Sequence, residues 1–118
     1  MTKAEFYEST GFGLYGFKIK NHSGYAAEGQ DIVCAAISAN TDLVMSLLEE
    51  AFGAEIEVDV NQKAAEVSCF VLHSDIDISK KDIINRVLDV FYRELCELSQ
   101  QYPQNINCKI IRKEGLSC

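Results

Sequence analysis

The sequence predicts an α+β fold with a mixed sheet of about five strands and two amphipathic helices. Two observations predict it. Short segments in which apolar and polar residues alternate are typical of half-buried strands, and two longer segments carry apolar residues at helical spacing. Their order is strand, strand, helix, strand, strand, helix, strand, and two helices packed on one sheet bury every apolar stripe. With 118 residues and no internal repeat, residues 1–118 are expected to form one domain.

The first two strands are predicted to form a hairpin. Residues 3–8 are the first strand, and the turn-forming residues Ser9, Thr10, Gly11 and Gly13 close it. Residues 15–20 alternate as the second strand, which would place Tyr15, Phe17 and Ile19 on one face.

A loop and the first helix follow. Residues 21–30 contain two glycines and little apolar periodicity, which indicates a loop. Asp31 is a preferred N-cap residue, and Gly53 is a typical residue to end the helix. The apolar positions between them, at helical spacing, are Val33, Ile37, Val44, Leu48 and Ala51.

The second half supplies two strands, a helix and a final strand. Residues 56–60 alternate as the third strand. The more continuous apolar run of residues 65–72, the fourth strand, favours an interior position in the sheet. Ser79 and Asp82 resemble a capping box at the start of the second helix. Its apolar stripe is Ile84, Val87, Leu88, Phe91, Leu95 and Leu98; Pro103 follows it, and Ile106, Cys108 and Ile110 mark the fifth strand.

Composition excludes several classes of function. The net charge is −7, and the 11 Lys and Arg residues are scattered, so we expect no direct nucleic-acid partner. The start of the chain lacks the apolar stretch of a secretory signal, and no run approaches about 18 consecutive apolar residues, so we expect a cytoplasmic protein with no membrane partner. Five cysteines, an odd number without a CxxC pair, and only two histidines predict neither a disulfide framework nor a metal site or other cofactor.

A candidate Cys–His pair lies between the second strand and the first helix. His22 follows the strand, and Cys34 is the third helical residue if Asp31 is the N-cap. A thiolate is the nucleophile of cysteine enzymes. A helix N-terminus favours negative charge by about 0.3–1 kcal/mol, which is less than about one pKa unit. A neighbouring imidazolium, here that of His22, would have to supply the rest.

Two further residues are candidates for supporting roles. Asp31 either caps the helix or also orients His22, and the sequence does not decide between these roles. Ser38, one helical turn after Cys34, either hydrogen-bonds near the thiol or donates to a developing oxyanion. The remaining cysteines and the second histidine are interpreted as structural or exposed: Cys69, Cys96, Cys108, Cys118 and His73.

These residues also form a recognisable motif. The run His22-Ser23-Gly24-Tyr25-Ala26, then Gly29, then Asp31-Ile32-Val33-Cys34-Ala35-Ala36-Ile37-Ser38, resembles the ribosomal-processing cysteine protease family, Prp. The resemblance implies a homodimeric cytoplasmic endopeptidase that removes the N-terminal extension of a large-subunit ribosomal protein after an aromatic residue. It implies Cys34 as nucleophile, His22 as base, and Asp31 and Ser38 in support.

The resemblance also implies that the loop from Gly24 to Gly29 covers the site until substrate arrives. Tyr25 in this loop is a candidate to line the groove for an aromatic substrate residue. Two positions depart from the family's pattern: Asn21 stands where glycine is common, and Ser23 replaces a frequent alanine. The alternatives are a non-catalytic ribosome-assembly or protein-binding module with Cys34 packed in the core, and a thiol redox sensor.

Overall fold

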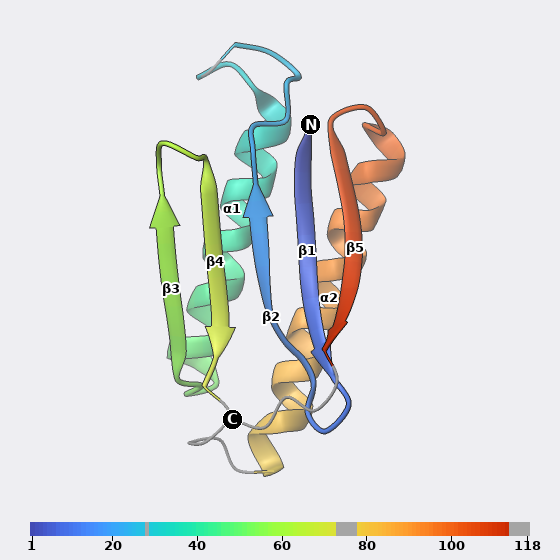
Figure 1. The fold of residues 1–118 in the computed structure, drawn as a ribbon. Helices are drawn as coiled ribbons and strands as arrows, with labels where there is room; N and C mark the ends of the chain where they lie inside the picture. Colours follow the sequence, from blue (N-terminus) through green and yellow to red (C-terminus); the bar gives the residue numbers. More distant parts are fainter. Residues whose placement is uncertain (28, 73–77, 114–118) are drawn as a thin grey trace.

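The computed structural model describes residues 1–27, 29–72 and 78–113. A five-stranded mixed sheet, in the order β3-β4-β2-β1-β5, carries both helices on one face (Figure 1). The elements are β1 (Thr2–Ser9), β2 (Gly13–Lys20), α1 (Ile32–Ser46), the π-helical continuation η1 (Leu47–Ala51), β3 (Ile56–Asn61), β4 (Glu66–Val71), α2 (Ile78–Gln101) and β5 (Ile106–Lys113). The predicted α+β class and the order of the elements are confirmed.

The first and last strands of the chain are neighbours in the sheet. β1 pairs with β2 in antiparallel register and with β5 in parallel register, with Thr2 opposite Ile106. β4 lies between β3 and β2, both antiparallel to it, so its predicted interior position is confirmed. The sheet therefore depends on a pairing between the two ends of the described chain.

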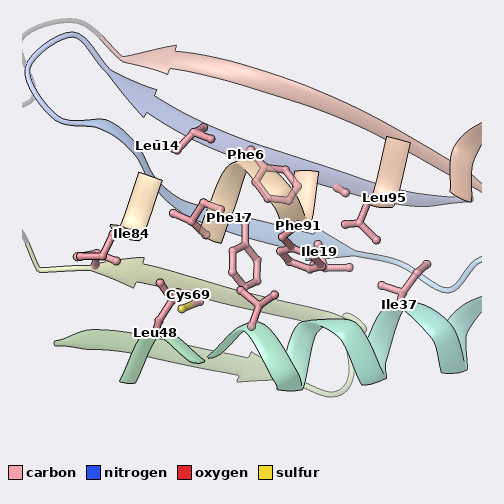
Figure 2. Packing of buried hydrophobic residues seen from close by; sticks show 14 of the residues in the cluster. Phe6, Leu14, Phe17, Ile19, Ile37, Leu48, Cys69, Ile84, Phe91 and Leu95 are labelled. Carbon is pink, nitrogen blue, oxygen red and sulfur yellow. The ribbon is translucent and has the colours of Figure 1, made fainter. Parts of the chain in front are cut away.

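Three phenylalanines form the centre of the core between the sheet and the helices (Figure 2). The ring of Phe91 on α2 lies 5.4 Å from that of Phe6 and 5.1 Å from that of Phe17, both edge-to-face. Edge-to-face packing places the positive edge of one ring on the negative face of the next. Leu48 and Cys69 join the same cluster and have no exposed surface. This core fixes α1 and α2 against the sheet.

The structure corrects the predicted position of Tyr15. The register of β1 and β2 shifts between Tyr7 and Glu8. As a result, Tyr15 does not join Phe17 in the core but packs on Tyr7 and Phe70, with ring centroids 6.4 and 5.9 Å apart. Successive residues of a strand point to opposite faces, so this aromatic group lies on the face of the sheet away from the helices.

The helix boundaries agree with the prediction at α1 and differ at α2. Helical structure begins directly after Asp31 and ends before Gly53, whose φ of 67° is the left-handed conformation of a terminating glycine. Helix α2 begins at Ile78, so Ser79 is not the N-cap but lies within the first turn. The residues that precede α2, including His73, lie outside the described part of the chain, as does Cys118.

One helical stretch is long and apolar enough to cross a membrane by length and composition alone. Residues Ile32–Ala51 have a mean hydropathy of 1.4, although they contain no run of 18 consecutive apolar residues. A core helix of a globular protein meets the same criterion. Here Val33, Ile37 and Leu48 are buried in the cluster that joins the helices to the sheet, so we interpret the stretch as a core helix.

Candidate active site

The candidate residues lie at one end of the sheet. Figure 1 shows that the end of β2, the start of α1, the β3–β4 turn, the start of β1 and the α2–β5 connection all lie at this end. Each of these segments is anchored by a strand or helix of the core. Rigid elements of this kind hold functional side chains more precisely than a free loop does.

Asp31 caps α1 and also binds the preceding loop. Its Oδ1 accepts a hydrogen bond from Cys34 N at 2.9 Å, which confirms the predicted N-cap and places Cys34 at the third helical position. Its Oδ2 accepts from Ser23 Oγ at 2.5 Å and from Tyr25 N at 3.2 Å. Among the described residues, the hydrogen bonds found for this carboxylate therefore go to the loop and the helix, and none of them goes to His22.

These hydrogen bonds set the protonation state of Asp31. Desolvation of the carboxyl group acts to raise its pKa, but hydrogen bonds from Ser23, from Cys34 and from the backbone of Ala26 outweigh it. The net effect lowers the pKa from 3.8 to about 2. Donors favour the charged form of a carboxylate. Asp31 is therefore an ionised, hydrogen-bonded anchor at neutral pH.

Cys34 Sγ accepts a hydrogen bond from a backbone amide. Ser23 N donates to it at 3.2 Å, and the side chain of Cys34 is partly exposed. A hydrogen bond donated to sulfur stabilises a thiolate more than a thiol, because the acceptor then carries a full charge. The Ser23 N–H and the N-terminus of α1 thus both favour negative charge at this sulfur.

The backbone on the N-terminal side of His22 is fixed by its neighbour. Asn21 has a φ of 70°, donates from its N–H to Ala65 O at 2.8 Å and accepts from Thr2 Oγ1 at 3.0 Å. Asparagine is one of the few residues other than glycine that adopts this left-handed conformation readily. This explains why asparagine fits the position where the resembling family commonly has glycine. The imidazole of His22 is exposed.

Two cavities meet at the candidate residues. Cys34, His22 and Ser38 line both of them, with volumes of about 560 and 430 Å³. The larger cavity extends to the β3–β4 turn, and its further lining includes Ile19, Ile37, Val60, Ala65, Glu66 and Val67. The smaller one extends under the loop, and Ala26, Gly29, Asp31 and Ala35 complete its lining. The structure thus brings together the four residues proposed from the sequence, Cys34, His22, Asp31 and Ser38.

The three loop residues that are candidates for substrate binding differ in whether they line a cavity. Gly24 and Gly29 both have positive φ, and only Gly29 lines a cavity. Tyr25, 47% exposed, lines neither cavity, and its ring packs edge-to-face on Tyr102 at 5.5 Å. Sequence analysis missed Tyr102, and its position in the chain offered no signal, because it lies 77 residues from Tyr25.

The other described cysteines lie outside the site. Burial raises the pKa of the Cys69 thiol to about 12. Burial, together with the neighbouring Cys96, does the same for Cys108. Within residues 1–27, 29–72 and 78–113, no group of three or more His, Cys, Asp or Glu side chains is arranged to hold a metal ion.

Comparisons with known proteins point to one family. The family described as cysteine protease Prp matches residues 1–107. No curated protein sequence matches the chain.

Solved structures share the fold. The ribosomal processing protease Prp from S. aureus, in complex with a covalently linked product peptide, is similar with a TM-score of 0.80 and 14% identity, over 94% of this chain and 100% of that one. The protein SMU.848 from Streptococcus mutans is similar with a TM-score of 0.78 and 21% identity, over 96% of each chain. The family match covers nearly the whole chain, and the chain therefore belongs to the cysteine protease Prp family and is a cysteine protease.

Proposed function

We propose that this protease removes the N-terminal extension of a large-subunit ribosomal protein, with Cys34 as nucleophile and His22 as base. The assignment of residues rests mainly on one observation, which is that His22 lines the same two cavities as Cys34. The hydrogen bond from Ser23 N to Cys34 Sγ supports it. The substrate is proposed from the sequence motif and from the similar S. aureus protease, which is a ribosomal processing protease with solved peptide complexes.

The proposed chemistry is acyl transfer through a thioester. The Cys34 thiolate attacks the scissile carbonyl carbon, and the C–N bond breaks as His22 protonates the leaving amine. His22 then takes a proton from water, which hydrolyses the thioester and releases the Cys34 thiolate. The two cavities that Cys34 lines supply room for the peptide around the cleaved bond.

The hydrogen bond that caps α1 limits which groups can donate to the developing oxyanion. A backbone N–H at the start of α1 is one kind of donor, but the N–H of Cys34 already donates to Asp31 Oδ1. We therefore assign this role to the hydroxyl of Ser38, which lines both cavities. A donor aimed at the charge that develops in the transition state is typically worth about 10²–10³ in kcat.

Mass spectrometry of the extended ribosomal protein tests the proposal. The protein is incubated with the wild-type enzyme, with Cys34→Ala and with Cys96→Ala, a matched control in which another partly exposed cysteine is removed. We expect loss of the extension after an aromatic residue with the wild type and with Cys96→Ala only. Cleavage by Cys34→Ala would contradict Cys34 as nucleophile, and no cleavage by the wild type would contradict the proposed substrate.

The same resemblance leads us to propose a homodimer that acts in the cytoplasm. Sedimentation equilibrium of the purified chain checks the first part, because a dimer would have twice the mass of the 13.2 kDa chain. A single species of monomer mass across the concentration range would rule out the dimer.

A further inference from the structure

Ser23, next to His22, is held at three points. Its N–H donates to Cys34 Sγ, its hydroxyl donates to Asp31 Oδ2, and its carbonyl oxygen accepts from Asn105 Nδ2 at 3.1 Å. The residue is only 1% exposed. Two of these contacts come from the start of α1, but the third comes from the far end of the chain, 82 residues later.

Asn105 is itself rigidly held. It lies in the connection between α2 and β5, where its N–H donates to Tyr102 O at 2.9 Å and its carbonyl accepts from Thr2 N at 2.8 Å. The side chain therefore extends from a backbone that is bonded both to the residue that follows α2 and to β1. A carboxamide placed in this way holds its acceptor in one position, because its own freedom is already lost.

We propose that Asn105 is a positioning residue for the Cys34–His22 pair, a role that rests on the proposed function of these two residues. By holding the carbonyl of Ser23, the Asn105 carboxamide keeps the Ser23 N–H against Cys34 Sγ. His22 then lies between two anchored residues, because Thr2 Oγ1 holds the carbonyl of Asn21 on the other side.

This arrangement accounts for how His22 is positioned when the hydrogen bonds of the Asp31 carboxylate go elsewhere. A catalytic imidazole is commonly oriented by a third side chain that accepts from its second nitrogen. Here the backbone on both sides of His22 is fixed instead, by Thr2 and by Asn105. Loss of the Asn105 contact lets the loop leave the conformation in which the Ser23 N–H meets the sulfur. The thiolate then loses a donor that favours the charged form.

The pH dependence of Cys34 alkylation tests this proposal without a peptide substrate. The full chain, Asn105→Leu, Asn105→Ala and the control Asn107→Ala, which changes an exposed residue of β5, are treated with iodoacetamide between pH 5 and 9. The modified Cys34 peptide is quantified by mass spectrometry. We expect Cys34 in both Asn105 variants to react about threefold to tenfold more slowly at pH 6. The control is expected to match the wild type.

Two results would overturn the proposal: a wild-type alkylation profile in a folded Asn105 variant, or an equal change in Asn107→Ala. Thermal melting of each variant shows which ones are folded, and the near-isosteric Asn105→Leu serves if Asn105→Ala does not fold. Because alkylation needs no peptide, failure to cleave a ribosomal protein would contradict the proposed substrate and leave this result standing.

Discussion

The hydroxyl of Ser23 donates a hydrogen bond of 2.5 Å to Asp31 Oδ2, and both residues are buried at the start of α1. One carboxylate thus serves as the cap of the helix and as the anchor of the loop that carries His22. An alanine, which is frequent at this position in the resembling family, could not make this hydrogen bond. The hydrogen bond ties the position of the loop to the integrity of the helix N-terminus.

Ser23→Ala should therefore lower stability while preserving the contact to sulfur. The variant removes one donor to an ionised carboxylate, which typically costs about 1.5–3 kcal/mol. The N–H of Ser23 is retained, so Cys34 should still be alkylated at pH 6. Urea denaturation at pH 7 measures the change in the free energy of unfolding. Ser46→Ala, an exposed serine with no cap hydrogen bond, is the matched control and should change it by less than about 0.5 kcal/mol.

The free energy of unfolding should fall in acid, because the carboxylate of Asp31 becomes protonated. Its pKa is lowered from 3.8 to about 2, so the folded state holds this proton less tightly than the unfolded chain does. The stabilisation is complete above about pH 5 and is lost as the pH falls from about 4 toward 2. Asp31→Asn should thus melt below the wild type at pH 7, and the difference in Tm should shrink across that window. A difference that stays constant down to pH 2 would contradict the assigned pKa.

Gly16→Ala should disrupt packing on the face of the sheet away from the helices. A Cβ at this position would lie 2.3 Å from Phe70 Cδ1 and 2.6 Å from Cys69 O, so the aromatic group or the strand must move. Overpacking of this kind costs about 1–3 kcal/mol. Gly11→Ala is the control, because no atom lies within 4 Å of the Cβ that it would add. Equal chemical denaturation curves for the two variants would show that β2 can shift to admit the methyl group.

The contact between Tyr25 and Tyr102 should influence substrate binding. Edge-to-face aromatic pairs contribute about 0.5–1.5 kcal/mol, and here the contact holds the loop beside the cavities. We expect Tyr25→Ala to raise KM about threefold to tenfold with little change in kcat, because the freed loop must be ordered when the peptide binds. Tyr102→Ala should raise KM by a similar factor. The KM of the double variant should be about equal to that of either single variant, because both substitutions remove the same contact. An unchanged KM in Tyr25→Ala would remove Tyr25 from substrate binding.

Features that depend on local sequence were predictable. The N-cap at Asp31 and the third helical position of Cys34 follow from residues three positions apart, and the structure has the corresponding hydrogen bond. The helical stripe of α2 likewise predicted the face that packs on the core. In β3 the alternation did not, because Ile56 packs on the core whereas Val58 and Val60 are exposed. These patterns reflect the periods of strand and helix, which any short segment displays by itself.

Features that depend on pairing between distant segments were not predictable. The register shift near Tyr7 arises between two strands, and it moved Tyr15 out of the core although its own strand alternates regularly. Asn105 reaches the loop because β5 lies beside β1, and Thr2 reaches it because β1 lies beside β2. Residues so far apart leave no local pattern. Ser79 and Asp82 fit the pattern of a capping box, but α2 already includes Ile78, so Ser79 lies inside the helix and not at its N-cap.

The parallel pairing of β1 with β5 has a consequence for biosynthesis. The motif that contains His22 and Cys34 is translated before β5, yet Ser23 is fixed by Asn105, and β1 gains its second neighbour only when β5 emerges. We expect a nascent chain stalled before β5 to lack the rapid alkylation of Cys34 at pH 6, which a fragment of residues 1–104 can test. The chain would then be unable to cleave other proteins under synthesis nearby until β5 has been translated.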